Sequence, residues 1–303
     1  MSLHLRLHQL KALIGVVEHG GIRAAARQMH LSQAALTKSL RQLEEDAGLA
    51  LLVRSPRGVV LTDAGQRLYD RAYLVHRQLD LANDELRQAA GDPRGQVRIA
   101  LTPFVALQSL GQAFRWFRAR YPQVVIEVAE GLMARVLPRL REGSLDFAVV
   151  ADTGDLPEGE LTRQVLLRSE QHIVVREGHP ILQAASASAL SQLEWVLTGP
   201  RAHWHSDRLN RLFEMAGHVP PTQVVICETL AGLTLLRESD VAGVVPEPLL
   251  QQPEGRGLVP LHLPELVPGS FELTMIHRPD VPLTPAAEFL ARCVADACVN
   301  RSA

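Results

Sequence analysis

The sequence predicts a mixed α/β fold with a small helical module, a long helix and a larger body of alternating strands and helices. Three short helical patterns precede any strand, and a long amphipathic pattern follows them. From residue 96 onward, β-prone runs alternate with amphipathic segments. The 303 residues suffice for about two domains of roughly 150 residues each. We therefore expect domains at residues 1–62 and 93–303, joined by a helix over residues 63–92.

Charge is divided unevenly between these parts. Residues 1–62 hold eight Lys and Arg side chains against four acids, a net charge of +4. The whole chain carries −2, so the remainder carries −6. A small basic module attached to an acidic body is typical of a phosphate-binding segment on a soluble carrier.

Cysteine usage and hydropathy exclude several classes of protein. The three cysteines, Cys227, Cys293 and Cys298, form no CxxC pair, so neither a disulfide framework nor a thiolate zinc site is predicted. No apolar run approaches the roughly 20 residues that span a bilayer, and the first residues lack the pattern of a signal peptide. We expect a cytoplasmic protein with no membrane partner.

Three helices are predicted at the start of the chain. The first covers residues 5–17 and the second, rich in alanine, covers residues 22–30. Ser32 is a suitable N-cap for a third helix that runs to about Asp46. In this third helix, Leu36, Leu40 and Leu43 form a buried stripe at spacings of four and three.

The opposite face of the third helix is polar near its N-terminal end. An amide, a hydroxyl and two cations lie there, on Gln33, Thr37, Lys38 and Arg41, beside the small Ala34. Such side chains can reach base edges in a major groove while the helix N-terminus points at phosphate. The alternative is an ordinary solvated helix face, and this stretch alone leaves both open.

A β-hairpin is predicted after the third helix. Residues 51–53 and 59–61 are β-prone and bracket a turn that bears Arg54 and Arg57. Beside the third helix, these arginines could lie along the DNA backbone or in a minor groove. The alternative is a surface turn whose arginines contact only solvent.

About sixty residues in order resemble the winged helix-turn-helix of LysR-type transcriptional regulators. The resemblance is carried by AAA at 24–26, LSQAALTKSLRQLE at 31–44, LLVR at 51–54 and RGVVLTDAG at 57–65. It implies base contacts from the third helix and wing contacts from Arg54 and Arg57. Many members have Pro in place of Ala34, so their base preference does not transfer there. The expected DNA-binding residues are Ser32, Gln33, Ala34, Thr37, Lys38, Arg41, Arg54 and Arg57.

A long helix is predicted from Thr62 or Asp63 to about Ala90. Small and apolar residues repeat along it at the a and d spacing of a coiled coil, which favours a dimer with two DNA-binding heads on an interrupted palindrome. The alternative is packing on the chain's own body. The resemblance implies pairing between subunits and commonly a tetramer. The repeating residues are Leu68, Ala72, Val75, Leu79, Ala82 and Leu86.

The body is predicted to contain two α/β units with parallel sheets and a cleft between them. Residues 97–151 show a βαβαβ pattern, and a second series covers residues 173–245. The resemblance implies a periplasmic-binding-protein-like effector domain, in which a strand near 271–277 and the helix after Pro285 return to the first unit. We expect subdomain I at about 93–165 and 270–303, and subdomain II at about 166–269.

A small effector, expected to be anionic, is predicted to bind in this cleft. Thr102 and Thr229 each follow a predicted strand, where a hydroxyl and free N–H groups can hold an anion. Plain N-capping would suit both threonines equally well. The weak likeness of the C-terminal half to regulators of aromatic sulfonate and sugar-compound metabolism agrees with an anion. With the positions implied by the resemblance, the expected effector contacts are Thr102, Pro103, Phe104, Gly131, Leu132, His203, Trp204 and Thr229.

The function predicted from these patterns is a ligand-responsive transcriptional regulator that binds double-stranded DNA and, as expected for such a protein, RNA polymerase. No GxSxG, HExxH, Walker or GxGxxG motif is present, so we expect no enzyme activity and no cofactor. His203 and His205 lack the further ligands of a zinc site, so no metal is expected. The alternatives are a solute-binding or transport-accessory protein and, less favoured, an enzyme with a fused regulatory head.

Overall fold

The computed structural model describes residues 5–55, 58–92, 94–152, 154, 156, 159–198 and 204–299. Within this part, the chain divides into two compact units. The head unit comprises the residues up to Asp92 together with Arg141–Ser144, and the body unit comprises the rest. The boundary after Asp92 coincides with the Gly-rich and Pro-containing stretch that ends the long helix.

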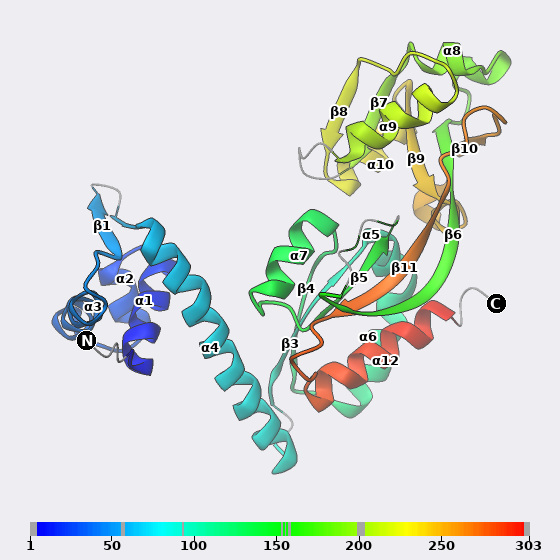
Figure 1. Cartoon of the computed structure of the whole chain (residues 1–303). Helices are drawn as coiled ribbons and strands as arrows, with labels where there is room; N and C mark the ends of the chain where they lie inside the picture. The colour runs from blue at the N-terminus through cyan, green and yellow to red at the C-terminus, as the bar shows by residue number, and fades with distance from the viewer. Residues whose placement is uncertain are drawn as a thin grey trace. The chain divides into compact units, whose positions relative to one another are not determined.

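The head unit contains four helices and one hairpin among its described residues (Figure 1). All three short helices begin and end within two or three residues of the predicted positions. Their facing sides bury Leu13, Leu36 and Leu43 fully, and the small Ala25 and Ala26 allow close packing of the second helix. The elements are α1 Leu7–Glu18, α2 Ile22–Gln28, α3 Gln33–Ala47, β1 Leu52–Ser55, β2 Gly58–Leu61 and α4 Asp63–Ala89.

The start of α4 is held against the chain that precedes β1. The Thr62 hydroxyl accepts a hydrogen bond from the Gly65 N–H at 3.0 Å and donates to the Ala50 carbonyl at 2.8 Å. A Cβ at Gly65 would lie 2.0 Å from the Leu51 carbonyl oxygen, so only glycine allows this approach. Thr62 is therefore the N-cap of the long helix, one of the two residues predicted for this role.

The body unit alternates strands and helices, as predicted. Its first series is β3 Gln96–Leu101, α5 Pro103–Val105, a π-helical segment Ala106–Leu110, α6 Gly111–Arg120, β4 Val125–Glu130, α7 Met133–Arg141 and β5 Phe147–Asp152. The second begins with β6 Thr162–Arg176, a 3₁₀ turn Pro180–Gln183, α8 Ala187–Leu190, β7 Glu194–Thr198, α9 Trp204–Met215 and β8 Val224–Cys227. It continues with α10 Thr229–Glu238, β9 Val241–Pro246, α11 Glu247–Leu250, a 3₁₀ turn Pro253–Gly255, β10 Leu258–Leu261, β11 Ser270–His277 and α12 Pro285–Val299.

The described strands of the body join in one nine-stranded sheet in the order β4-β3-β5-β11-β6-β9-β7-β8, with β10 beside β6. We call β3, β4 and β5 with their helices the first lobe, and β7, β8 and β9 with theirs the second lobe. Within each lobe these strands are parallel. Strands β6 and β11 run together from one lobe to the other (Figure 1).

The prediction of parallel sheets is wrong for these connecting strands. Strand β11 is antiparallel to both β5 and β6, and β6 is antiparallel to β9 and β10. The pairing of β11 with β5 confirms that the chain returns to the first lobe. The sequence indicated only residues 173–176 of β6, because most of its earlier residues are polar or partly exposed and lack an apolar run.

Helices cover both faces of the sheet in the first lobe. Phe147 and Val149 of β5 pack with the residues of α6 and α12, while Ala148 and Val150 pack with those of α7. This alternation follows from the two-residue period of a strand. In the second lobe, the buried Trp195 stacks edge-on against Phe213 of α9. Both faces are therefore closed, and the carboxyl ends of the strands are the open edge of each lobe.

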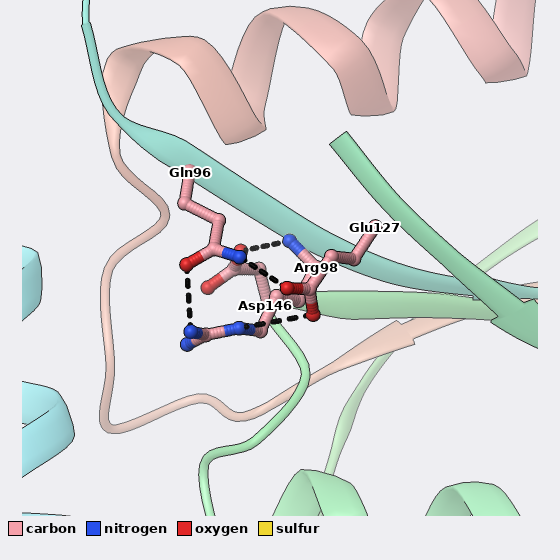
Figure 2. Close-up of polar contacts among 4 residues, drawn as sticks. All are labelled: Gln96, Arg98, Glu127 and Asp146. Carbon is pink, nitrogen blue, oxygen red and sulfur yellow. Dashed lines mark hydrogen bonds and ion pairs between the residues drawn. The ribbon is translucent and has the colours of Figure 1, made fainter. Parts of the chain in front are cut away.

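A polar network holds together the amino ends of the first-lobe strands (Figure 2). The Arg98 guanidinium donates to Glu127 at 3.3 Å and to Gln96 at 2.6 Å, and Gln96 also contacts Glu127. The Asp146 carboxylate accepts the Arg98 backbone N–H at 2.7 Å. This network joins β3 to β4 and to Asp146, the residue that precedes β5. It lies at the amino ends of these strands, away from the carboxyl ends.

Candidate functional site

The polar face of α3 is exposed over a buried apolar stripe. Leu36, Leu40 and Leu43 are at most 4% exposed. The other side of the helix is solvent-accessible at Gln33, Ala34, Lys38 and Arg41, and Thr37 is half-buried. The residues predicted for DNA contact therefore share one surface, which we call the α3 surface and define by Ser32, Gln33, Ala34, Thr37, Lys38 and Arg41.

Local hydrogen bonds fix both ends of α3. The Ser32 hydroxyl accepts the Ala35 N–H at 3.1 Å, which is the predicted N-cap. Near the other end, the Glu44 carboxylate accepts the backbone N–H groups of Leu51 and Leu52 at 2.9 and 3.1 Å. Glu44 thus joins α3 directly to β1, a contact that the sequence patterns did not reveal. The α3 surface and the hairpin are consequently held together.

Of the two predicted wing residues, the structure describes only the backbone of Arg54. Arg54 lies in β1 opposite Val59 of β2, and its side chain is outside the described structure. Arg57 lies outside the described residues altogether. The hairpin itself is present as predicted, with four residue pairs from Leu52 and Leu61 to Ser55 and Gly58.

The predicted seam of α4 divides into a covered and an exposed half. Ala72 is buried and Leu68 is half-buried against the core of the head unit. Farther along the helix, Val75, Leu79 and Leu86 are 47%, 39% and 71% exposed. The first part of the seam therefore packs on the head unit itself, and the residues from Val75 onward are exposed, so pairing between subunits stays a prediction.

A cavity of about 380 Å³ lies between the two lobes of the body. Residues at or next to the carboxyl ends of β3, β4 and β5 in the first lobe and of β7 and β9 in the second line it. Helix N-termini and strand ends meet at such an edge, which is where α/β proteins bind ligands. The cleft predicted between two α/β units is thus present as a defined cavity.

Six of the eight predicted effector contacts line this cavity. They come from the start of the helical stretch after β3, from the turn after β4 and from the start of α10. His203 lies outside the described residues, and so does the side chain of Trp204. The six residues that the structure brings together are Thr102, Pro103, Phe104, Gly131, Leu132 and Thr229.

The first-lobe wall of the cavity is built on a close backbone contact. The Gly131 N–H donates to the Leu101 carbonyl at 2.7 Å. A Cβ at Gly131 would lie 2.5 Å from the Leu101 carbonyl carbon and 2.6 Å from the Thr102 nitrogen. The chain after β4 can therefore pass this close to the chain after β3 only with glycine. Thr102 is 8% exposed and forms no side-chain cap, so capping does not use its hydroxyl.

A cation that the sequence patterns missed also lines the cavity. Arg208 of α9 donates from Nη2 to the Gln171 side-chain oxygen at 3.1 Å. Gln171 belongs to the connecting strand β6, where its N–H donates to the Gly269 carbonyl. Among the expected effector contacts, only His203 has a side chain that can carry a charge, and it lies outside the described residues. A sequence signal for Arg208 does exist, because it lies in the first turns of a helix that follows a strand. Thr102 was predicted from a similar position, directly after a strand.

Polar contacts also join the lobes at the far side, where β4 and β8 end. The Thr229 hydroxyl donates to Glu130 at 2.6 Å. Arg135 of α7 and Glu228 form an ion pair at 2.5 Å, and the hydrogen bond from Arg135 holds the pKa of the Glu228 carboxyl below its usual value. Both partners of the ion pair are about half exposed, so its contribution to stability is small.

The described residues offer no other evident chemical site. They contain no group of three or more His, Cys, Asp and Glu side chains that could hold a metal ion. Burial raises the pKa of the Cys293 and Cys298 thiols, which lie on α12 in the first-lobe core, so neither is an activated nucleophile. None of the described helices combines the length and apolarity needed to cross a bilayer.

Two family models match the chain. The model described as "Bacterial regulatory helix-turn-helix protein, lysR family" matches residues 7–66, which include α1, α2, α3 and the hairpin. The model described as "LysR substrate binding domain" matches residues 90–299, which include the cavity.

Similar proteins are found among curated regulators and solved structures. The chain is 25% identical over 197 residues to the transcriptional regulator TdcA of Escherichia coli K12, covering 65% of this chain and 63% of that protein. It is 28% identical to the transcriptional regulator GalR of Pseudomonas putida over 94% of this chain and 72% of GalR. The structure of ArgP from Mycobacterium tuberculosis shares the fold, with a TM-score of 0.70, 21% identity and coverage of 97% and 98% of the two chains.

Proposed function

The chain belongs to the LysR family of bacterial regulatory helix-turn-helix proteins, and from this premise we propose that it controls transcription by binding specific DNA sites in response to a small ligand. The observation that carries the proposal is the pairing of an exposed polar α3 surface with a cavity in a separate α/β unit. One region can contact DNA while the other binds the ligand.

The α3 surface is proposed to contact base edges. Gln33 and Lys38 are exposed and can form bidentate or charged hydrogen bonds in the major groove, while Thr37 and Ala34 can pack against bases. The N-terminus of α3, capped by Ser32, and the Arg41 side chain suit phosphate contacts. Arg54 and Arg57 are proposed to contact the DNA backbone or minor groove from the hairpin.

The DNA-binding proposal is tested with the DNA upstream of the protein's own gene. We expect purified full-length protein to bind one fragment of this region more tightly than a scrambled duplex of equal length and composition, measured by fluorescence anisotropy at moderate salt. Equal affinity for both duplexes would contradict sequence-specific binding. A selection from random duplexes would then show whether any sequence is preferred at all.

The cavity is proposed to bind the effector. The contacts are Thr102, Pro103, Phe104, Gly131, Leu132 and Thr229. His203 and Trp204, predicted from the resemblance, are further candidates. Ligand contact with both lobes would favour the closed arrangement of the body and thereby change the DNA affinity or bend. We expect Thr102→Val to weaken ligand-induced thermal stabilisation without affecting DNA affinity. Unchanged ligand affinity would remove Thr102 from the site.

The protein is proposed to act as a homodimer or homotetramer on an interrupted palindrome. The exposed half of the α4 seam supports dimerisation, because Val75, Leu79 and Leu86 would otherwise remain in water. Strand β4 lies at the edge of the described sheet and carries exposed Val125 and Val128 on its two faces, which supports a second contact in a tetramer. Light scattering should give a multiple of the chain mass, and Leu79→Glu should lower it. An unchanged mass would exclude the α4 seam.

Three further properties belong to this proposal. A regulator of this kind acts where its DNA lies, which supports a cytoplasmic location, and it acts together with RNA polymerase. We propose no enzyme activity, because the relatives are regulators. The alternative of a solute-binding protein leaves the matched helix-turn-helix of residues 7–66 without a use.

A further inference from the structure

The walls of the body cavity are mainly apolar. Leucine side chains line it from both lobes, together with Phe104 after β3 and Phe271 of the connecting strand β11. Removing an apolar ligand surface from water against such walls is favourable, whereas burying unpaired polar groups there is not. Most of the bound ligand is therefore expected to be apolar. The leucines are Leu107, Leu132, Leu137, Leu197, Leu209, Leu212, Leu233 and Leu249.

One arginine lines the cavity. Among the described lining residues, Arg208 alone has a charged side chain. Its contact with Gln171 places it beside β6, which is one of the two strands connecting the lobes. A guanidinium at the edge of an apolar cavity favours an anionic group that can accept its hydrogen bonds.

Acidic side chains lie next to the lining residue Thr229. Strands β4 and β8 are the outermost strands of the sheet, so the residues that follow them lie far from β6 along the cavity edge. Glu130, Glu228 and Arg135 adjoin the lining residues Gly131, Thr229 and Ala134 in sequence without lining the cavity themselves, and the three together carry a net charge of −1. A second anionic group of the ligand would be repelled near these residues.

Few hydrogen-bonding groups remain for a ligand with many hydroxyls. The Thr229 hydroxyl donates its proton to Glu130, and the Gln171 oxygen accepts from Arg208. Thr102 and Thr198 are the other lining hydroxyls among the described residues. A polyhydroxylated ligand would bury several hydroxyls without partners, which is unfavourable.

We propose that the cavity binds an amphipathic monoanion: one carboxylate or sulfonate beside Arg208, joined to an apolar body that extends between the lobes. This inference rests on the proposed role of the cavity as the effector site and narrows its ligand class. It excludes dicarboxylates and sugar acids, although the sequence pointed also to regulators of sugar compounds.

A matched set of six-carbon compounds separates these classes. Hexanoate is the apolar monoanion, hexanamide lacks its charge, adipate adds a second carboxylate and gluconate adds hydroxyls along the chain. Benzoate, benzamide and terephthalate are the aromatic counterparts of hexanoate, hexanamide and adipate. Binding to the full-length protein is measured by calorimetry at millimolar concentrations. We expect each monoanion to bind about 10- to 100-fold more tightly than its amide, as for a hydrogen bond to a charged group.

Three variants locate the binding. Arg208→Gln should reduce the affinity for hexanoate and benzoate to that of their amides. Arg211→Gln, an exposed arginine on the same helix, is the matched control and should leave these affinities unchanged. Ala134→Trp places a large side chain in the cavity from an exposed position of α7 and should prevent binding of all the compounds.

The outcomes distinguish the ligand class from the proposed function. If adipate or gluconate binds more tightly than hexanoate and Ala134→Trp prevents it, the cavity is a ligand site but the monoanion class is wrong. If Arg208→Gln leaves the preference of the acid over its amide intact, the class is likewise wrong. Binding that survives Ala134→Trp, or the absence of binding by the whole set, overturns the effector role of the cavity together with the class.

Discussion

The α3 surface and the body cavity place their polar groups in opposite ways. On α3, five polar side chains lie on a solvent-accessible face, and the apolar residues lie beneath them. In the cavity, apolar side chains form the walls, and Arg208 is the one charged side chain among the described lining residues. The first arrangement suits a large polyanion recognised through many exposed contacts, and the second suits a small ligand recognised mainly through desolvation.

The largest effect that separates the two regions is expected from Leu36→Ala. Leu36 is fully buried in the head core beneath the α3 surface. Its truncation should lower the free energy of unfolding of the head by about 2–5 kcal/mol and weaken DNA binding. The cavity belongs to the other unit, so its ligand affinity should not change. Calorimetric unfolding and ligand titration measure the two effects.

Lys38→Ala is the control for this substitution. Lys38 is exposed on the same helix, and its removal should change the head stability by no more than about 0.5 kcal/mol. Equal destabilisation by both variants would show that the leucine stripe does not hold α3 in place.

The two regions also differ in how far the sequence predicts them. The α3 surface follows from local information, because a helical period, the Ser32 cap and the spacing of Leu36, Leu40 and Leu43 together determine which face is exposed. Thr102 and Thr229 were likewise predicted from their positions after strands. Arg208 was missed, because its role depends on Gln171, which lies 37 residues away in the sequence.

In the fold, too, contacts between residues distant in sequence were not predicted, as the connecting strands β6 and β11 show. Strand β11 and its return to the first lobe followed from the resemblance. Residues 162–172 of β6 were missed, since most of them are exposed or partly exposed and lack the apolar pattern of a buried strand. The antiparallel pairing of β6 and β11 arises from contacts distant in sequence, which periodicity does not report.

The next largest effect is expected at the cavity wall. Gly131→Ala would place a Cβ 2.5 Å from the Leu101 carbonyl carbon, so the chain after β4 must move. We expect the body to lose about 1–3 kcal/mol of stability and ligand affinity to fall, while DNA binding by the unliganded protein persists. Thermal unfolding and ligand titration test this.

Gly111→Ala is the matched control. Gly111 begins α6, and the nearest atom to an added Cβ is Arg115 Nη1 at 3.9 Å. Alanine should therefore fit and slightly stabilise the helix. If Gly131→Ala behaved as Gly111→Ala does, the close approach of the two chains at the cavity wall would be disproved.

Alkaline pH is expected to affect the head. Burial, assisted by the charge of Glu18, raises the pKa of Tyr69 from 10.0 to about 12. The folded head therefore holds this proton more tightly than the unfolded chain does. The resulting stability is fully present below pH 10 and is lost as the pH rises through about 12.

Melting temperatures of the head between pH 9 and 12 test this dependence. Tyr69→Phe should flatten the decline above pH 10. Tyr73→Phe, one turn farther along α4, controls for the loss of a hydroxyl. A decline that is as steep in Tyr69→Phe as in the wild type would assign it to other groups.

The smallest effect is expected at acidic pH, where the ion pair that joins the two lobes is lost. Arg135 lowers the pKa of Glu228 below the usual 4.5, so the stabilising contact is present above that pH and is lost as the pH falls through the lowered value. Arg135→Gln should remove this part of the acid dependence of body unfolding. Identical acid dependence in Arg135→Gln and the wild type would show that the pair contributes nothing measurable.

The central claim, that the α3 surface recognises sequence, is tested most directly by the affinity of Gln33→Ala for a preferred and a scrambled duplex. Gln33 is exposed at the first position of α3, so the substitution should leave the fold intact. The account predicts a loss of about 1–3 kcal/mol on the preferred duplex and little change on the scrambled one. An equal loss on both duplexes would contradict it.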